Sequence, residues 1–227
     1  MTIWRNIKRF FIPHICPLCG HRLMEDELNL CTDCRISLPM VPTCKEANEH
    51  FFLATHAVEK EKAMLYFDKD GIVSDLLHQM KYGHNAQLCK QMGEELCIYA
   101  DRTAFFKDID VLLPIPLHPA RQKERGYNQS EELAKGIAGR ASLPVCTDAL
   151  IRIHNNATKT KTKLFSRREH NSFLFQATPQ AKNLRGKHIA LIDDVLTTGT
   201  TLTEAIDALN HIEELRISVV TLARVRS

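Results

Sequence analysis

Three short, continuous apolar runs along this chain have the length and β-branched content of buried strands. They cover residues 110–116 (DVLLPIP), 189–192 (IALI) and 217–223 (ISVVTLA). Four further segments repeat apolar residues every three or four positions, which predicts helices. These helical segments span residues 71–83, 85–101, 129–142 and 202–209. Strands that alternate with helices predict an α/β fold with a parallel sheet.

The remaining segments carry weaker patterns. Residues 1–12 place apolar side chains at helical spacing, which predicts a short amphipathic helix. Residues 46–62 are mixed, and we expect them to link an N-terminal unit to the main domain, with room for one strand. Three polar segments are expected to lack regular structure. They are residues 117–129 (LHPARQKERGYNQ), 151–186 and 193–201.

Residues 189–201 (IALIDDVLTTGTT) join a buried strand to a Thr/Gly-rich turn and then to a helix. Ligands of open α/β sheets bind at the carboxyl ends of strands. Backbone N–H groups, threonine hydroxyls and the positive end of the following helix favour an anion at this point, and a glycine lets the backbone curl around it. The segment lacks the GxxxxGK[ST] and GxGxxG signatures, so it predicts a cradle for a monophosphate. The residues of this cradle are Thr197, Thr198, Gly199, Thr200 and Thr201.

Two adjacent carboxylates, Asp193 and Asp194, come directly before the cradle. Because like charges repel, we expect them beside the phosphate rather than on it. Paired carboxylates at this point suit the vicinal hydroxyls of a ribose, directly or through Mg²⁺. The alternative is a strand that ends in an N-capping Asp pair, with the threonines serving as part of the cap.

Four of the eight cysteines follow the spacing Cys16-x2-Cys19-x11-Cys31-x2-Cys34. Two CxxC turns that face each other aim four thiolates at one point, which is the arrangement of a closed structural zinc site. An iron–sulfur cluster is the competing interpretation, and Cys44 or His21 could replace one ligand. The spacing therefore predicts an N-terminal zinc ribbon.

A length of 227 residues predicts one full domain and a smaller attachment, at ~150 residues per domain. We expect an N-terminal helix and zinc ribbon at residues 1–45 and the main domain at residues 46–227. No apolar run approaches the ~18 residues that span a bilayer. Basic residues interrupt the N-terminal apolar segment, so a signal peptide is not expected. The sequence predicts a cytoplasmic protein without a membrane span.

The net charge of +3 averages two unlike parts of the chain. Residues 151–188 hold nine Lys or Arg and one acid, a net +8, and the rest of the chain sums to −5. Such a stretch indicates an anionic ligand, namely phosphate, pyrophosphate or nucleic acid, with a solvated loop as the alternative. Phe165, Phe173 and Phe175 interleave these charges, either as stacking faces for bases or as core residues.

Several motifs together resemble the ComF family, whose members carry a type I phosphoribosyltransferase domain. IALIDDVLTTGTT resembles the loop with which such domains bind 5-phosphoribosyl 1-pyrophosphate (PRPP). The segments DVLLPIPLHPARQKERGYNQSEELAKGIA and DLLHQMKYGHNAQLCKQMGEEL, with the four-cysteine ribbon, extend the resemblance over essentially the whole chain. It implies a parallel-sheet, Rossmann-like α/β domain with a small N-terminal zinc ribbon.

The resemblance also implies roles for single residues. Asp193 and Asp194 would be the catalytic pair that holds the ribose 2- and 3-hydroxyls, partly through Mg²⁺, and residues 197–201 would hold the 5-phosphate. The pyrophosphate would meet three cationic side chains, Arg121, Lys123 and Arg125. The family usually carries a Gln after a Thr in the segment that here contains Lys161, so the role of that Gln stays unassigned.

Two functions fit these features. The first, which the resemblance implies, is a PRPP-binding, Mg²⁺-dependent phosphoribosyltransferase-fold protein with an unknown acceptor and a role in DNA uptake and natural transformation. The second is a non-catalytic adaptor that binds single-stranded DNA through the ribbon and residues 151–188, with PRPP as a regulatory ligand. DNA-uptake proteins would be its partners. The sequence leaves catalysis and the choice between monomer and dimer open.

Overall fold

The structure is a computed structural model of the whole chain, and it describes four stretches of it, residues 14–43, 58–101, 104–154 and 173–226. The helix predicted at residues 1–12 lies outside these stretches, as do most of residues 46–62 and the domain boundary expected between residues 45 and 46. Within the described residues, no helix is long and apolar enough to cross a membrane.

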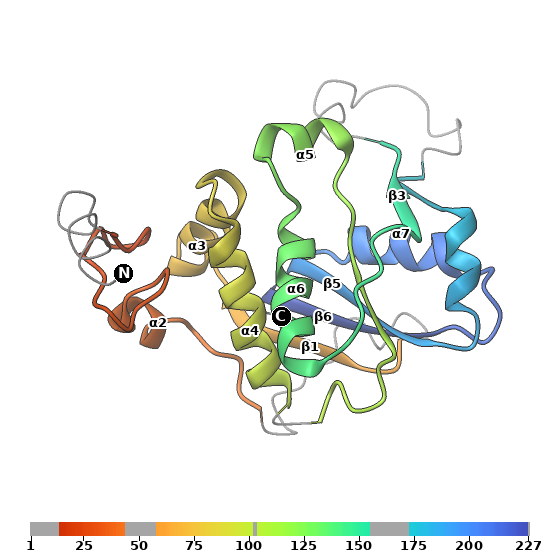
Figure 1. The fold of residues 1–227 in the computed structure, drawn as a ribbon, viewed down its shortest axis with the longest axis horizontal. Coiled ribbons are helices and arrows are strands. Elements are labelled where there is room, and N and C mark those ends of the chain that lie inside the picture. Colours follow the sequence, from red (N-terminus) through yellow and green to blue (C-terminus); the bar gives the residue numbers. More distant parts are fainter. Residues whose placement is uncertain (1–13, 44–57, 102–103, 155–172, 227) are drawn as a thin grey trace, which may run out of the picture.

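A four-stranded parallel sheet forms the centre of the main domain (Figure 1). Its strands lie in the order β1 (Glu61–Phe67), β6 (Arg216–Val225), β5 (His188–Leu196) and β2 (Val111–Pro114). The parallel α/β fold expected from the sequence is therefore confirmed. Three of these strands coincide with predicted apolar runs, whereas β1 overlaps only the last two residues of the segment 46–62, in which a strand was expected to fit.

Four helices match the predicted segments closely. They are α3 (Ile72–Tyr82), α4 (Ala86–Asp101), α6 (Gln129–Ala141) and α7 (Thr200–Leu209). Helix α3 ends where the sequence places Gly83, whose N–H donates to the carbonyl oxygen of Gln79. Helix α7 begins earlier than predicted, directly after Gly199, which adopts the left-handed conformation with φ of 76°.

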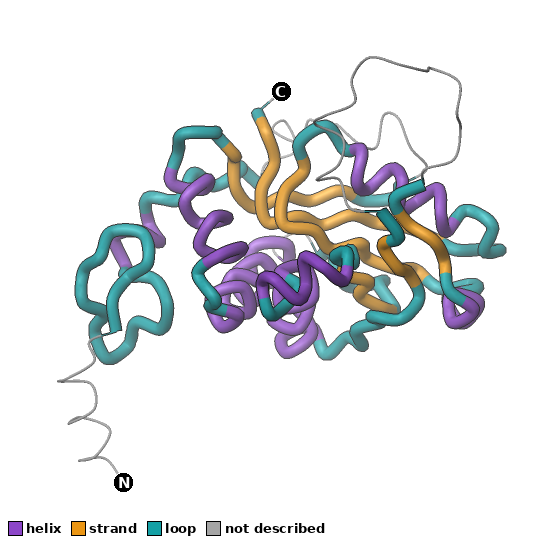
Figure 2. The backbone as a smooth tube through the Cα atoms, turned by 90° about the horizontal axis from the view of Figure 1, so that it is seen from above, coloured by secondary structure: helices purple, strands orange, loops and turns teal. Residues whose placement is uncertain are grey.

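The sheet separates two apolar cores, because side chains of successive strand residues point to opposite faces. On one face Leu112, Ala190 and Val220 pack with α3, α4 and α6. On the other face Leu191 and Val219 pack with α7 and with a 3₁₀ helix, η3 (Pro179–Leu184). Figures 1 and 2 show these helices arranged around the strands.

Two polar segments that were expected to be irregular contain regular structure. Residues 119–125 form α5 (Pro119–Arg125), which begins at a proline, a residue pre-set for the first helical position, and ends at Gly126 in the left-handed conformation. A short hairpin, β3 (Leu150–Arg152) with β4 (Phe175–Ala177), and η3 occupy the described parts of residues 151–186. The expectation of loops was therefore wrong here, and for residues 119–125 the reason is that proline and glycine also mark the two ends of a short helix.

The predicted strand at residues 189–192 was too short. Strand β5 continues to Leu196 because β6 keeps pairing with it, with Asp193 opposite Thr221 and Val195 opposite Ala223. The two carboxylates expected in a loop therefore stand on the last part of a strand. Because this part of β5 pairs with β6, the backbone of Asp193 and Asp194 is held more firmly than it would be in a loop.

The four-cysteine segment packs directly against the main domain. The N–H of Val41 donates to the carbonyl oxygen of Met64 at 2.8 Å, and the N–H of Tyr66 donates to that of Pro39 at 2.8 Å. The Tyr99 hydroxyl on α4 donates to the carbonyl oxygen of Val41 at 2.8 Å. Residues of both parts share one apolar core. Figure 1 shows the segment with α2 (Thr32–Ile36) beside α3 and α4.

Candidate functional site

A pocket of about 270 Å³ opens at the carboxyl edge of the sheet, between the ends of β2 and β5. Its walls come from elements far apart in the sequence: the last turn of α3, the segment after β2, helix α5, the start of α6, strand β3, the end of β5 and the start of α7. This edge is where open α/β sheets bind their ligands.

The predicted carboxylate pair lines this pocket, and both residues are buried. One oxygen of Asp193 accepts from the Ser130 hydroxyl at 3.1 Å and from the backbone N–H of Asp194 at 2.9 Å. The carboxylate of Asp194 lies 2.6 Å from the ammonium of Lys81. Hard carboxylate oxygens are the ligands that Mg²⁺ prefers, so the donor chemistry of this pair fits that ion.

Burial raises the pKa of Asp193 to about 7, and the neighbouring charge of Asp194 acts in the same direction. The ordinary value is 3.8, so between about pH 4 and pH 7 the folded protein retains a proton that the unfolded chain has released. Stability therefore falls as the pH rises through this window. Above about pH 7 Asp193 is ionised in the folded protein, and its buried negative charge lowers the free energy of unfolding.

Asp193→Asn keeps the shape of the side chain and removes that charge. We expect it to raise the free energy of unfolding by about 2 kcal/mol at pH 8 and to change it little at pH 4. Urea unfolding at the two pH values measures the effect, with Asp207→Asn, an exposed change on α7, as the control. An equal effect of Asp193→Asn at both pH values would contradict this account.

The residues predicted to hold a phosphate lie at the start of α7. Thr197 and Thr201 line the pocket, and Gly199 provides the left-handed turn between them. The hydroxyls of Thr198 and Thr200 lie 3.0 Å apart, and both side chains are exposed. The positive end of the ten-residue helix α7 thus faces the pocket together with two threonine side chains.

Helix α5 separates the three predicted pyrophosphate residues. Arg121 and Arg125 are four residues apart, which places them on one face of the helix, and both line the pocket. Lys123 falls between them on another face, is exposed and does not line the pocket. Residues 119–125 were expected to form a loop. They form helix α5 instead, and this helix places Arg121 and Arg125 at the pocket and Lys123 away from it.

The pocket also contains residues that sequence reasoning did not single out for it, namely Lys81, Gln129, Ser130 and Arg152. Arg152 stacks over the Phe175 ring at 5.3 Å on the β3–β4 hairpin. Gln129 and Ser130 begin α6. They belong to the segment of residues 110–138 that resembles the ComF family, but the resemblance assigned them no role. Lys81 lies in the last turn of α3, where basic residues are common.

Two buried N–H groups in the pocket walls have no hydrogen-bond partner within the described residues. They are Nε of Arg125 and Nε2 of Gln129. Buried donors without partners are rare in folded proteins, because each costs the free energy of a lost hydrogen bond to water. Such donors beside a pocket fit an anionic or hydroxyl-bearing ligand.

The Arg-Gly-Tyr-Asn run after α5 holds the pocket walls together. The guanidinium of Arg125 lies 5.2 Å from the centre of the Tyr82 ring, and the Tyr127 hydroxyl donates to the carbonyl oxygen of Met80 at 2.7 Å. Asn128 caps α6 through its side-chain oxygen and donates to the carbonyl oxygen of Ile115 at 2.9 Å. The last turn of α3, the segment after β2 and the start of α6 are thus tied to one another.

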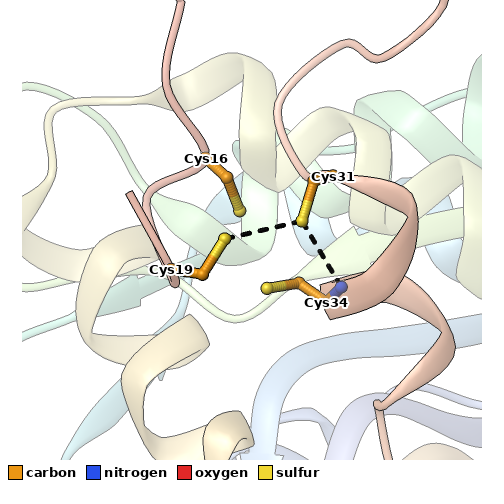
Figure 3. Close-up of side chains that lie close together, drawn as sticks. All are labelled: Cys16, Cys19, Cys31 and Cys34. Carbon is orange, nitrogen blue, oxygen red and sulfur yellow. Dashed lines mark hydrogen bonds between the residues drawn. The ribbon is translucent and has the colours of Figure 1, made fainter. Parts of the chain in front are cut away.

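The four predicted cysteine ligands converge as expected (Figure 3). Their sulfur atoms all lie within 4.8 Å of one another, and those of Cys19 and Cys31 are 3.6 Å apart. Tetrahedral Zn–S bonds of about 2.3 Å place sulfur atoms about 3.8 Å apart, so the cluster could hold a zinc ion. His21 uses its carbonyl oxygen to accept from the N–H of Cys16, and Cys44 lies outside the described residues.

Backbone groups around the first CxxC turn favour a thiolate. Burial opposes ionisation of Cys16, but backbone hydrogen bonds from Cys31, Leu18 and Cys19 outweigh it and lower the pKa of Cys16 to about 7. Gly20, with φ of 75°, closes the turn by donating its N–H to the carbonyl oxygen of Cys16 at 2.8 Å. The turn is thus shaped to present sulfur to a metal ion.

Comparison with known proteins gives relatives over most of the chain. Competence protein F of Haemophilus influenzae is 26% identical over 220 residues, which cover 92% of this chain and 96% of that protein. The DNA utilization protein YhgH of Escherichia coli is 25% identical and the competence protein ComFC of Bacillus subtilis is 27% identical. These alignments cover 85% and 83% of this chain, and 89% and 68% of the two relatives. A family model described as phosphoribosyl transferase domain matches residues 127–227.

Proposed function

The chain is a homologue of the competence proteins F and ComFC and carries a phosphoribosyl transferase domain, and we propose that it binds PRPP with Mg²⁺ in the pocket at the carboxyl edge of the sheet. One observation carries this proposal. A buried carboxylate pair, a threonine-lined helix start and two arginines line the same pocket. These groups match the diol, the 5-phosphate and the pyrophosphate of PRPP.

Each part of the ligand would meet the group that suits its chemistry. Asp193 and Asp194 would hold the 2- and 3-hydroxyls, with oxygens that could also hold Mg²⁺. Residues 197–201 would hold the 5-phosphate at the start of α7. Arg121 and Arg125 would bind the pyrophosphate, because guanidinium groups match phosphate oxygens in geometry and charge. Lys123 is exposed and does not line the pocket, so we leave it out of the proposed pyrophosphate-binding residues.

If the protein also transfers the phosphoribosyl group, its residues act mainly by electrostatics. The bond between ribose C1 and pyrophosphate breaks through a transition state with oxocarbenium character. Mg²⁺, when bound, would neutralise part of the leaving group. Arg121 and Arg125 would stabilise the charge that develops on the pyrophosphate oxygens, and the carboxylates would hold the ribose in position. The acceptor is left open.

Isothermal titration calorimetry with PRPP and Mg²⁺ tests the proposal. Arg121→Met is expected to weaken PRPP binding at least tenfold, because a charged hydrogen bond to phosphate contributes about 1.5–3 kcal/mol. The double change Asp193→Asn with Asp194→Asn is expected to weaken it at least a hundredfold. Lys123→Met, on another face of α5, is the matched control and should leave the affinity unchanged. An absence of PRPP binding to the wild-type protein would overturn the proposal.

A second function, single-stranded DNA binding in DNA uptake, draws support from the names of the relatives and from the +8 charge of residues 151–188. Among the described residues of that stretch, Phe173 is 58% exposed, whereas Phe175 is buried under Arg152. Phe173 is therefore the better stacking face, and Phe165 lies outside the described residues. Affinity for an oligonucleotide should then fall steeply as salt rises, and a flat dependence would contradict DNA binding.

Three further assignments belong to the same proposal. The four-cysteine cluster would hold structural zinc rather than an iron–sulfur cluster, since four sulfur atoms within 4.8 Å of one another suit the tetrahedral shell of a single ion. The chain would divide into a ribbon at residues 1–45 and a phosphoribosyltransferase-like domain at residues 46–227. It would act in the cytoplasm, with DNA-uptake proteins as partners and with a dimer as one possible assembly.

A further inference from the structure

The ammonium group of Lys81 forms an ion pair with one of the two buried carboxylates in the pocket. Nζ of Lys81 lies 2.6 Å from Oδ2 of Asp194, and the Lys81 side chain is 25% exposed. Lys81 comes from the end of α3, whereas the phosphate cradle and the arginines come from α7 and α5. Lys81 lies within the segment DLLHQMKYGHNAQLCKQMGEEL, whose sequence resembles the ComF family, but the motif assigned it no role.

Electrostatics explain why a cation is needed there. Asp193 and Asp194 are adjacent and buried, so when both are ionised their negative charges repel each other where water screens them poorly. The backbone N–H and the Ser130 hydroxyl stabilise Asp193, but they supply no positive charge. Lys81 provides the ion pair to Asp194 and brings the net charge of the pair closer to −1.

Neighbouring contacts hold the last turn of α3 at the pocket. The Tyr127 hydroxyl donates to the carbonyl oxygen of Met80, directly before Lys81, and Arg125 stacks on Tyr82, directly after it. These contacts hold the backbone on both sides of Lys81, while its partly exposed side chain pairs with Asp194. Arg121 and Arg125, which line the same pocket, mark the side on which an anionic ligand would sit.

We propose that Lys81 is an exchangeable counter-ion of Asp194. It pairs with Asp194 while the pocket is free, gives way when a divalent cation or a ribose diol engages the carboxylates, and then pairs with phosphate oxygens of the ligand. This inference rests on the proposed function for the identity of the ligand. Lys81 thus partly neutralises the carboxylates until the ligand arrives and contacts the ligand afterwards.

The competition between Lys81 and a cation has a measurable consequence. In the ligand-free protein a divalent ion must displace the ammonium, so its affinity for the carboxylates is held down. With a neutral side chain at position 81, the same carboxylates would carry their full charge and bind the ion more tightly. The phosphate-bearing ligand would lose one cationic partner at the same time.

Electron paramagnetic resonance of free Mn²⁺, titrated with protein in the absence of ligand, tests the exchange. Lys81→Met and Lys81→Gln are expected to bind Mn²⁺ at least tenfold more tightly than the wild type, whereas Lys81→Arg should stay close to it. Adding Asp194→Asn to Lys81→Met should abolish the gain. A structural role alone would leave Mn²⁺ affinity unchanged, and thermal unfolding of each variant checks that it is folded.

Calorimetry with PRPP and with ribose 5-phosphate completes the test. Lys81→Met should weaken PRPP binding at least tenfold and ribose 5-phosphate binding less than threefold, because only PRPP carries the pyrophosphate. Unchanged Mn²⁺ affinity in the folded neutral variants, or unchanged PRPP affinity, would overturn the exchange. Failure of PRPP to bind the wild type would overturn the proposed function instead, and the Mn²⁺ titrations would still decide whether Lys81 competes with a cation.

Discussion

Cys31→Ser is expected to leave the protein without zinc and to unfold the packed segment of residues 14–43. Cys31 provides one of four clustered sulfur atoms and caps α2, where its sulfur accepts the N–H of Cys34 at 3.4 Å. The described segment has one five-residue helix and contributes only a few buried side chains, three of them cysteines, to the core it shares with the main domain, so the metal would supply much of its stability. Structural zinc sites contribute about 10 kcal/mol or more of apparent binding free energy.

Metal analysis by mass spectrometry measures this effect, together with the rate of proteolytic cleavage within residues 14–43. The wild type should contain one zinc per chain, and Cys31→Ser none. Cys146→Ser is the matched control, because Cys146 lies outside the cluster. Iron in place of zinc, with visible absorbance, would favour the competing iron–sulfur interpretation. A full zinc content in Cys31→Ser would contradict the four-thiolate site.

Gly136→Ala is expected to destabilise the protein by about 3 kcal/mol, a large effect for one added methyl group. Gly136 on α6 and Gly93 on α4 lie where the backbones of the two helices pack directly against each other. A Cβ atom at position 136 would meet the carbonyl oxygen of Lys90 far inside 3.0 Å, a distance that real Cβ contacts essentially never show. This oxygen belongs to the backbone of α4, which cannot move aside as a flexible side chain can. The two helices would therefore have to separate.

Gly139→Ala on the same helix is the matched control, because a Cβ there meets nothing within 4 Å. It should raise the free energy of unfolding by up to about 1 kcal/mol through helix propensity. Urea unfolding of both variants gives the comparison, and Gly93→Ala should resemble Gly136→Ala because its Cβ would meet the carbonyl oxygen of Leu133. Equal stabilisation by Gly136→Ala and Gly139→Ala would contradict the close approach of the helices.

Elements with a strong local pattern were predictable from the sequence. Helices α3, α4 and α6 each repeat their buried residues with helical period, and β5 and β6 are dense in apolar side chains. Strand β1 was not, because Glu61 and Lys62 dilute its apolar run. Lys62 is buried all the same, with its ammonium 5.8 Å from the centre of the Tyr99 ring, and only the packed fold provides that partner.

The ComF resemblance is confirmed by relatives over most of the chain, whereas the roles of the site residues stay proposals. Motif order alone indicated the carboxylate pair and the threonine turn, because a strand, a turn and a helix follow one another directly. It did not separate Arg121 and Arg125 from Lys123, since that distinction requires helix α5. The four cysteines were predictable because two CxxC turns need only a short connection.

The sequence by itself determined which donor groups this protein has and which of them are neighbours along the chain: the adjacent carboxylates, the threonine turn and the paired cysteines. Only the tertiary structure decided what those groups face. Lys81 and Ser130 contact the carboxylates, and Arg152 lines the same pocket, because the strand order β1-β6-β5-β2 brings segments far apart in the chain to one edge of the sheet. Local periodicity carries no information about such an approach, because it depends on how helices and strands far apart in the chain bury their apolar faces together.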